Sequence, residues 1–202
     1  MRYGIPYMGS KNDIAEWVVG HFPKKENLYD LFAGGCAITH RALLTRKFSN
    51  YYINDLDGGV TQLFLDAIAG KYRNETRWVS REDFFEIKEV DPYVKCCWSF
   101  GSGGRSYMYG KEIEDYKYCL HQAIVFRNYV PFKERHGIDL SEIDVLNNIT
   151  SRRLAAKRVI ARENKEAERS DTTLQHLENL ERLQNLQYLE QLQSCCKVSA
   201  IV

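Results

Sequence analysis

Apolar positions recur along the first 75 residues with two alternating periods. Short apolar runs in residues 27–33 and 50–53 have the pattern of buried strands, whereas residues 36–44 and 60–68 show the spacing of helices. Residues 12–22 predict a further helix, which Asn12 or Asp13 caps and whose apolar face contains Ile14, Trp17 and Val18. Helices and strands that alternate in this way favour a parallel sheet flanked by helices. The sequence therefore predicts an α/β fold for this region.

The pattern changes after residue 75. Ser80 and Asp83 predict a capping box at the start of a short helix. Residues 98–110, WSFGSGGRSYMYG, are aromatic and glycine-rich, which predicts a surface loop. Helical spacing returns in residues 111–126 and in the basic stretch 151–169. We predict a mainly helical lobe over residues 76–170.

The carboxyl-terminal part has a different repeat. Leucine recurs at every third residue from Leu174 to Leu192. An α-helix turns about 100° per residue, so these leucines would circle a helix instead of forming a coiled-coil seam. We interpret residues 171–193 as a low-complexity helical insert, and the alternative of a poorly ordered segment stays open. Residues 194–202 contain the apolar run KVSAIV, which predicts the start of another strand.

Charge and cysteine content exclude several classes of protein. The formal net charge is +1, so any nucleic-acid site has to be a local patch. The six cysteines include no C-x-x-C pair, and the chain does not begin with a signal segment, so we expect reduced thiols in a cytoplasm. No stretch approaches the ~20 apolar residues of a membrane span. The five histidines show no metal-ligand spacing, and we predict no metal site.

Paired glycines follow the first predicted strand. Gly34 and Gly35 lead into a helix, whose first turn offers backbone N–H groups and a positive dipole end. Asp55 lies 21 residues after Gly34, close to the ~20 residues that separate the glycine turn from the ribose-binding acid in nucleotide-binding units. This spacing favours a ribose-bearing ligand; a plain tight turn beside an exposed aspartate stays open. G-x-G-x-x-G is absent, which argues against a dinucleotide.

Three segments carry a resemblance to a known family. IPYMGSK at residues 5–11, YDLFAGGCA at 29–37 and YYINDLD at 51–57 resemble, in order and spacing, the opening motifs of adenine-specific DNA methyltransferases of the Dam-like family. The resemblance implies a partial Rossmann-like fold that binds S-adenosylmethionine (SAM) in a lobe at residues 1–75. It also implies that residues 76–170 form a DNA target-recognition lobe, and that a methyl group passes from SAM to the exocyclic amine of adenine in double-stranded DNA.

The same resemblance assigns the cofactor-binding residues. Tyr7, Gly9 and Lys11 would contact SAM. Asp30 would hold its methionyl end and Asp55 its ribose. The turn that would approach the cofactor consists of Phe32, Ala33, Gly34, Gly35 and Cys36. Cys36 departs from the family pattern, because glycine is usual at that position.

Two groups of residues are candidates for DNA contacts. The first lies in the glycine-rich loop and consists of Ser99, Phe100, Arg105, Tyr107 and Tyr109. Aromatic rings with a cation suit stacking at a flipped base, although a loop packed on its own lobe explains them equally well. Arg152 and Arg153 open the basic stretch, which either meets phosphates or forms a solvated face.

The catalytic tetrapeptide of the family, D-P-P-Y or a close variant, is missing. Asp91, Pro92 and Tyr93 lack one proline and precede the recognition segment, so we assign them no catalytic role and leave the catalytic residues unknown. An acidic or amide side chain and a proline carbonyl would have to accept the hydrogens of the adenine amine. We therefore expect an incomplete or truncated enzyme that binds with little turnover. A non-catalytic SAM-fold nucleic-acid-binding or regulatory module is the alternative, and another nucleotide-binding α/β enzyme is a third.

Overall fold

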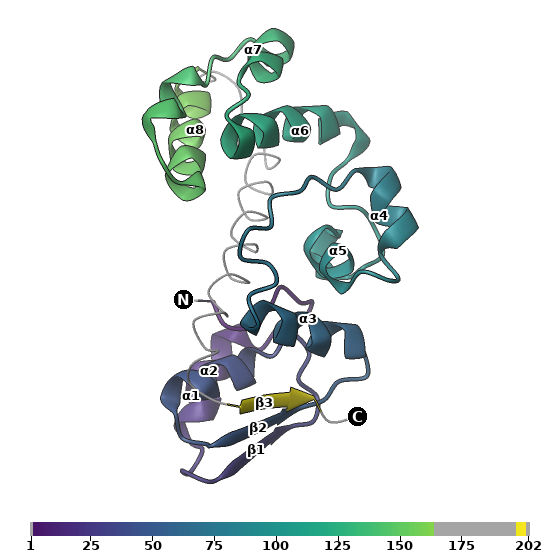
Figure 1. Ribbon diagram of the computed structural model, residues 1–202, viewed down its shortest axis with the longest axis vertical. Helices are drawn as coiled ribbons and strands as arrows, with labels where there is room; N and C mark the ends of the chain where they lie inside the picture. Colours follow the sequence, from purple (N-terminus) through teal and green to yellow (C-terminus); the bar gives the residue numbers. More distant parts are fainter. Residues whose placement is uncertain (1, 164–196, 201–202) are drawn as a thin grey trace. The chain divides into compact units, whose positions relative to one another are not determined.

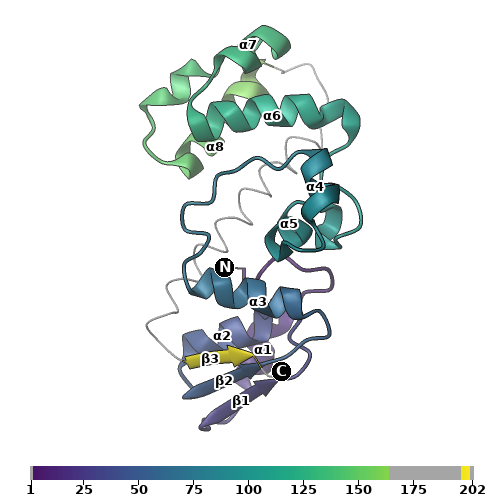
Figure 2. The same cartoon turned by 45° about the vertical axis from the view of Figure 1, so that its right-hand side comes forward.

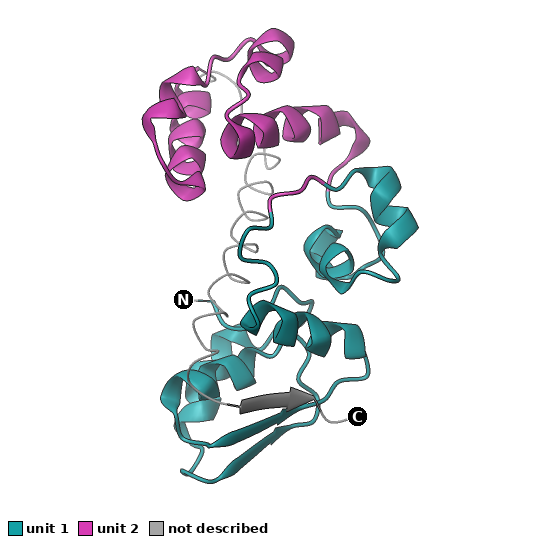
Figure 3. Cartoon of the chain, in the orientation of Figure 1, with its two compact units in different colours: residues 1–75, 79–108, 181–202 teal, residues 76–78, 109–180 magenta. Residues whose placement is uncertain are grey.

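The computed structural model describes residues 2–163 and 197–200 (Figure 1). The chain divides into two compact units (Figure 3). Unit 1 contains residues 1–75, 79–108 and 181–202, and unit 2 contains residues 76–78 and 109–180. Residues of the predicted recognition lobe thus occur in both units, and their role in DNA recognition stays a prediction. The leucine repeat at 171–193 lies outside the described residues.

Unit 1 is an α/β unit. Its elements are α1 (Asn12–Gly20), β1 (Asn27–Asp30), α2 (Ala37–Thr45), β2 (Asn50–Ile53), α3 (Gly58–Ile68), α4 (Arg81–Ile87), α5 (Pro92–Cys97), the 3₁₀ helix η1 (Phe100–Ser102) and β3 (Lys197–Ala200). β1 pairs in parallel with β2, and β2 pairs in parallel with β3, in the sheet order β1-β2-β3. The predicted alternation of helices and strands around a parallel sheet is confirmed. β3 lies in the apolar run where the sequence predicts a strand.

One face of this sheet is covered by helices. α2 and α3 lie over the same face in both orientations (Figures 1 and 2). Tyr51 and Ile53 point into that layer and are buried, and the Tyr51 hydroxyl donates to the carbonyl of Ala42 at 3.3 Å. Because side chains alternate along a strand, Tyr52 takes the opposite face, where its ring stacks on Tyr29 at 4.7 Å. The core of unit 1 therefore lies between the helices and one sheet face.

Helix α1 forms where the sequence predicts it, but it buries a different face. Ala15 and Val19 are buried, whereas Ile14 and Trp17 are exposed. The small side chains of the buried face allow α1 to pack closely against α2. The predicted cap is also wrong, because the Asn12 side chain accepts a hydrogen bond from the Tyr3 N–H at 2.7 Å and does not cap the helix. The hydrophobic periodicity predicted the helix, whereas packing against α2 determines which face is buried.

The glycine-rich segment 98–110 is anchored at both ends. Ser99 and Tyr107 form an isolated antiparallel bridge, and Trp98, Met108 and Tyr109 are buried. The prediction of a surface loop is therefore wrong for these ends, because their aromatic side chains enter the cores of the units. The capping box that Ser80 and Asp83 predict at the start of α4 is confirmed.

Unit 2 is helical. It contains α6 (Lys111–Phe126), α7 (Val130–His136), the 3₁₀ helix η2 (Ser141–Val145) and α8 (Ile149–Glu163). α6 packs against both α7 and α8, and its buried side chains include Leu120 and Ile124. The helix predicted over residues 111–126 is confirmed. No helix among the described residues combines the length and the apolarity that a membrane crossing needs.

Candidate functional site

The loops that follow β1 and β2 meet at the carboxyl edge of the sheet. One oxygen of the Asp55 carboxylate accepts a hydrogen bond from the Gly34 N–H at 2.7 Å, and the other accepts from the Asp57 N–H at 3.0 Å. The Ala33 N–H donates to the Asn54 carbonyl at 2.9 Å. The sequence placed Gly34 and Asp55 on different motifs, and the fold joins them directly. This edge is where ligands bind in open α/β sheets.

Asp30 ends β1 at the same edge. Its carboxylate accepts a hydrogen bond from the Thr39 hydroxyl at 2.7 Å, so the first turn of α2 fixes the orientation of the side chain. Burial raises the pKa of Asp30, and the bond from Thr39 opposes that rise. Thr39 is a site residue that the sequence did not identify. The only feature of the sequence that could have identified it is its position in the first turn of the helix that follows the glycines.

The amino-terminal segment lies against the paired glycines. The Ile5 N–H donates to the Gly35 carbonyl at 2.8 Å, and the Gly4 N–H donates to Nδ1 of His40 at 2.8 Å. A Cβ at Gly35 would lie 2.7 Å from the Ile5 carbonyl oxygen and 2.7 Å from the Tyr7 Cβ. The bare backbone at Gly35 therefore admits this segment of the chain itself, a packing role that the sequence did not reveal.

The ring of Tyr7 covers the other glycine. A Cβ at Gly34 would lie 3.0 Å from the Tyr7 ring, and Gly34 has a φ of +49°. Burial raises the pKa of the Tyr7 hydroxyl, and the charges of Asp55 and Asp57 raise it further. Two of the predicted cofactor motifs, IPYMGSK and the glycine turn, are thus in contact.

A charged pair lies next to these motifs. The Lys95 ammonium group lies 3.0 Å from a carboxylate oxygen of Asp57, and this bond raises the pKa of Lys95. A cavity of about 140 Å³ adjoins the pair; its lining residues include Gly59, Pro92 and Cys96. Neither Asp57 nor Lys95 was among the predicted site residues, because no motif spacing links α5 to the start of α3.

The remaining predicted cofactor residues lie at the surface, with one exception. Gly9 and Lys11 are exposed, and the Lys11 ammonium donates to the Gly9 carbonyl at 2.9 Å. Phe32 is 91% exposed. Cys36 is buried, with a φ of 58° in the left-handed region that glycine adopts readily. The turn therefore survives the replacement of glycine by cysteine at a strain of about 1–2 kcal/mol.

The five predicted DNA contacts of the glycine-rich segment divide into exposed and buried residues. Phe100 and Arg105 are exposed. The Ser99 hydroxyl accepts from the Gly104 N–H at 2.9 Å, and the Tyr107 hydroxyl donates to the Val79 carbonyl at 2.6 Å, both in the interior. Tyr109 is buried against the Trp78 ring at 5.7 Å. Accessibility to a base thus favours Phe100 and Arg105.

Arg152 and Arg153 are buried in unit 2. Arg152 is 4% exposed, and its guanidinium donates to carbonyls at the end of α6, with Nε 2.6 Å from the Ile124 oxygen. Further bonds reach the carbonyls of Leu146 and Asn147 at 3.0 and 3.2 Å. Helix-terminal carbonyls lack partners within the helix, so these bonds stabilise the end of α6. A phosphate contact by Arg152 would compete with them, and it stays a prediction.

Asp91, Pro92 and Tyr93 form the start of α5. The Asp91 carboxylate accepts from the Tyr93 and Val94 N–H groups at 2.9 and 3.3 Å, so it caps the helix. The Tyr93 side chain is buried and stacks on Tyr72 at 5.0 Å. These contacts give the segment a structural role at the start of α5.

The carboxyl edge combines charged and apolar groups. Asp30 and Asp55 supply carboxylates, while Leu31, Phe32 and Leu56 expose apolar side chains beside them. Carboxylates bind hydroxyl and ammonium groups, and exposed aromatic rings offer a surface for stacking. The arrangement offers hydrogen-bond acceptors beside an exposed apolar surface.

A family model matches the part of the chain that contains these residues. Residues 7–97 match the family model for D12 class N6 adenine-specific DNA methyltransferases. The match includes the motifs at residues 29–37 and 51–57 in full and the motif at 5–11 from Tyr7 onward. It confirms the resemblance to this family. No curated protein and no solved structure matches the chain.

Proposed function

Starting from this family match, we propose that the chain binds SAM at the carboxyl edge of β1 and β2, in a Rossmann-like methyltransferase fold. The observation that carries the proposal is the hydrogen bond from Gly34 to Asp55, which joins two motifs of the matched family at one point. Each carboxylate oxygen has a second lone pair, so Asp55 can hold the turn and still accept from ribose hydroxyls. Asp30 would receive the methionyl ammonium group, and Phe32 would cover the adenine ring.

The reaction we propose is methylation of the exocyclic amine of adenine in double-stranded DNA. SAM supplies an activated methyl group when it is bound. The amine is a poor nucleophile, and the D-P-P-Y tetrapeptide whose side chain and carbonyl would accept its hydrogens is absent from this sequence. We therefore propose that this chain performs the binding part of the reaction with little turnover. Phe100 and Arg105 are the exposed residues of unit 1 that we propose for contact with the target base.

The absence of the tetrapeptide also favours a second candidate function. A module that keeps the SAM fold and binds nucleic acid without catalysis would need no amine acceptors. Transfer of a labelled methyl group from SAM to duplex DNA separates the two candidates. Turnover supports the enzyme, and binding of SAM and DNA without transfer supports the module.

Calorimetry with SAM tests the cofactor directly. Phe32→Ala should weaken SAM binding at least tenfold without loss of stability, because this side chain is 91% exposed. Val90→Ala, which alters another strongly exposed side chain of unit 1, is the matched control and should leave the affinity unchanged.

Asp55→Ala should weaken SAM binding as well, with some loss of stability because the Gly34 bond is removed.

Two results would contradict the cofactor assignment. One is tight binding of NAD or ATP with none of SAM. The other is unchanged SAM affinity in both Phe32→Ala and Asp55→Ala.

A further inference from the structure

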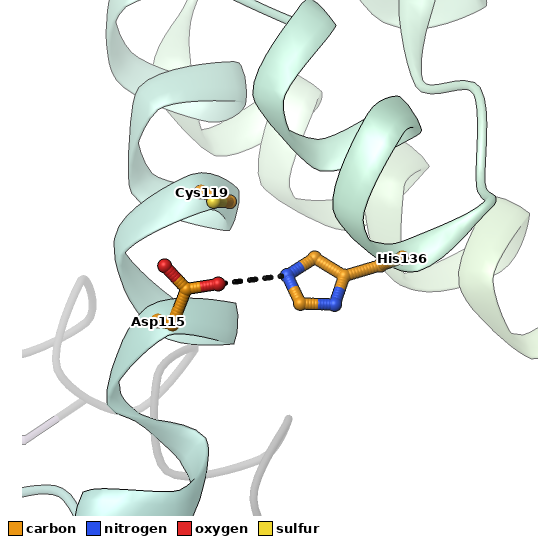
Figure 4. Close-up of side chains that lie close together, drawn as sticks. All are labelled: Asp115, Cys119 and His136. Carbon is orange, nitrogen blue, oxygen red and sulfur yellow. Dashed lines mark ion pairs between the residues drawn. The ribbon is translucent and has the colours of Figure 1, made fainter.

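Three side chains of types that can ligate a metal meet in unit 2, whereas the proposed SAM site belongs to unit 1. Asp115 and Cys119 lie one turn apart on α6, and His136 is the last residue of α7 (Figure 4). One ligand atom from each residue lies within 4.8 Å of the other two. Among the described residues, this is the one such group of histidine, cysteine and acidic side chains.

The local structure explains why these side chains converge. Residues four apart on a helix share a face, so Asp115 and Cys119 both point toward α7, against which α6 packs. Two rings pack against the His136 imidazole, Tyr116 at 4.8 Å and Phe132 at 5.1 Å, and they also contact each other at 5.0 Å. The imidazole is therefore positioned by packing.

The hydrogen bonding of this group is incomplete. Nε2 of His136 is buried and has no hydrogen-bond partner; it lies 3.7 Å from a carboxylate oxygen of Asp115. A buried polar atom of this kind costs free energy unless a ligand satisfies it. Burial lowers the pKa of His136, which favours the neutral imidazole, the form that offers a lone pair to a metal. The Cys119 thiol is buried beside it.

Arg135 occupies the other side of the carboxylate. Its guanidinium pairs with one oxygen of Asp115, while the second oxygen faces His136. Carboxylates that ligate metals commonly hold such an outer partner, which fixes their orientation. The pair with Arg135 therefore leaves one carboxylate oxygen available toward the centre of the group.

We propose that Asp115, Cys119 and His136 bind one Zn²⁺ ion, with water as the fourth ligand, and that the ion links α6 to α7. Zinc accepts mixed sulfur, nitrogen and oxygen donors in tetrahedral geometry. Its bond lengths imply distances of roughly 3.3–3.8 Å between ligand atoms. The 3.7 Å between Nε2 of His136 and the Asp115 carboxylate already lies in this range. The thiol loses its proton to solvent as the sulfur–zinc bond forms.

Metal titration of the purified full chain tests the site. After removal of metal by a chelator, Zn²⁺ added in competition with a chromophoric chelator should bind with one equivalent per chain. Co²⁺ should produce a thiolate charge-transfer band in the near ultraviolet. Cys119→Ser should abolish that band, and Asp115→Asn and His136→Gln should each weaken Zn²⁺ binding at least tenfold.

Matched controls separate this site from other thiols and imidazoles. Cys96→Ser and His21→Gln should keep full zinc binding, as should a variant with both Cys195 and Cys196 replaced by serine. Zn²⁺ should also raise the melting temperature of the wild-type chain and leave that of His136→Gln unchanged. None of these measurements uses SAM or DNA, so the outcome is independent of the proposed methyltransferase function.

X-ray absorption of the zinc-loaded wild-type chain supplies a test that needs no variant. We expect one sulfur ligand among nitrogen and oxygen ligands. No bound zinc at micromolar concentration, two or more sulfur ligands, or binding that survives all three substitutions would overturn the proposal.

Discussion

The amine of Lys117 is the buried group that the interior of unit 2 accommodates least well. The residue is 0% exposed, and its Nζ has no hydrogen-bond partner. The Nζ atom lies over the Tyr116 ring, 5.5 Å from its centroid. Burial lowers the pKa of Lys117 to about 7, because the charged form loses its hydration. Unit 2 therefore carries a destabilising group at the centre of α6.

Lys117→Met should stabilise the protein. Removing an unsatisfied buried amine while keeping the apolar stem should raise the free energy of unfolding by about 1–3 kcal/mol at pH 7. Urea denaturation followed by circular dichroism measures this change. Lys111→Met, at an exposed position of the same helix, is the control and should change stability by less than about 0.5 kcal/mol.

The stabilisation by Lys117→Met should decrease as the pH rises. Between about pH 7 and the unfolded value of 10.5, the unfolded chain binds more protons at Lys117 than the folded chain does. Wild-type stability therefore rises with pH through this window, and the advantage of Lys117→Met shrinks. A methionine variant that is less stable than wild type at pH 7 would show that the amine has a partner in solution.

At the scale of elements, the docking of residues 4–7 onto the glycine turn organises the proposed site. Two backbone N–H groups attach this segment: Gly4 donates to the His40 side chain of α2, and Ile5 donates to the Gly35 carbonyl of the turn. This close approach needs bare backbone at both Gly35 and Gly4, because a Cβ at either glycine would clash with backbone atoms of the other segment. A change at Gly35 should therefore act on both the stability and the ligand affinity of unit 1.

Gly35→Ala tests this arrangement. Its Cβ would meet backbone and Cβ atoms at 2.7 Å, which must shift, so we expect a loss of about 1–3 kcal/mol in unfolding free energy and weaker SAM binding. Gly58→Ala is the matched control, because a Cβ at the start of α3 meets nothing within 4 Å. Denaturant titration and calorimetry provide both readouts. Equal effects of the two substitutions would refute the packing role of Gly35.

At the scale of the whole molecule, the described residues of both units include a histidine whose pKa burial lowers strongly: His40 in unit 1 and His121 in unit 2. Burial lowers the pKa of His40 in unit 1 to about 4, and burial lowers the pKa of His121 in unit 2 to about 4. His40 accepts the hydrogen bond from Gly4, and His121 lies 2.9 Å from the Thr76 carbonyl. Protonation would end the acceptor role of His40 and place a charge in the core at both sites.

Acid should therefore destabilise both units. The unfolded histidines titrate near pH 6.5, so between about pH 6.5 and 4 the unfolded state binds more protons, and stability falls as the pH falls. Each histidine contributes up to about 3 kcal/mol to this loss. Thermal melts at pH 7, 5.5 and 4.5 measure it. His40→Asn and His121→Asn should each flatten the pH dependence of stability, and the exposed His21→Gln should not. Retention of the full slope in both asparagine variants would show that the two buried histidines do not cause the loss.

The sequence by itself determined the local elements and the order of the motifs. Hydrophobic periodicity and capping residues act over a few residues, so α6, the capping box of α4 and the alternation around the sheet were predictable. The sequence also places Gly34 and Asp55 21 residues apart, and the family match over residues 7–97 includes both.

Tertiary structure decided what each side chain does. Ala15 faces the core in place of Ile14, Arg152 stabilises a helix end, and Gly35 admits Ile5, because these roles depend on partners distant in the sequence. The group of Asp115, Cys119 and His136 has no sequence spacing typical of a metal site; α6 and α7 bring it together only when they pack. Hydrophobic periodicity shows which residues can share a face of one helix or strand. Only the packed structure shows which atoms of two different elements are in contact.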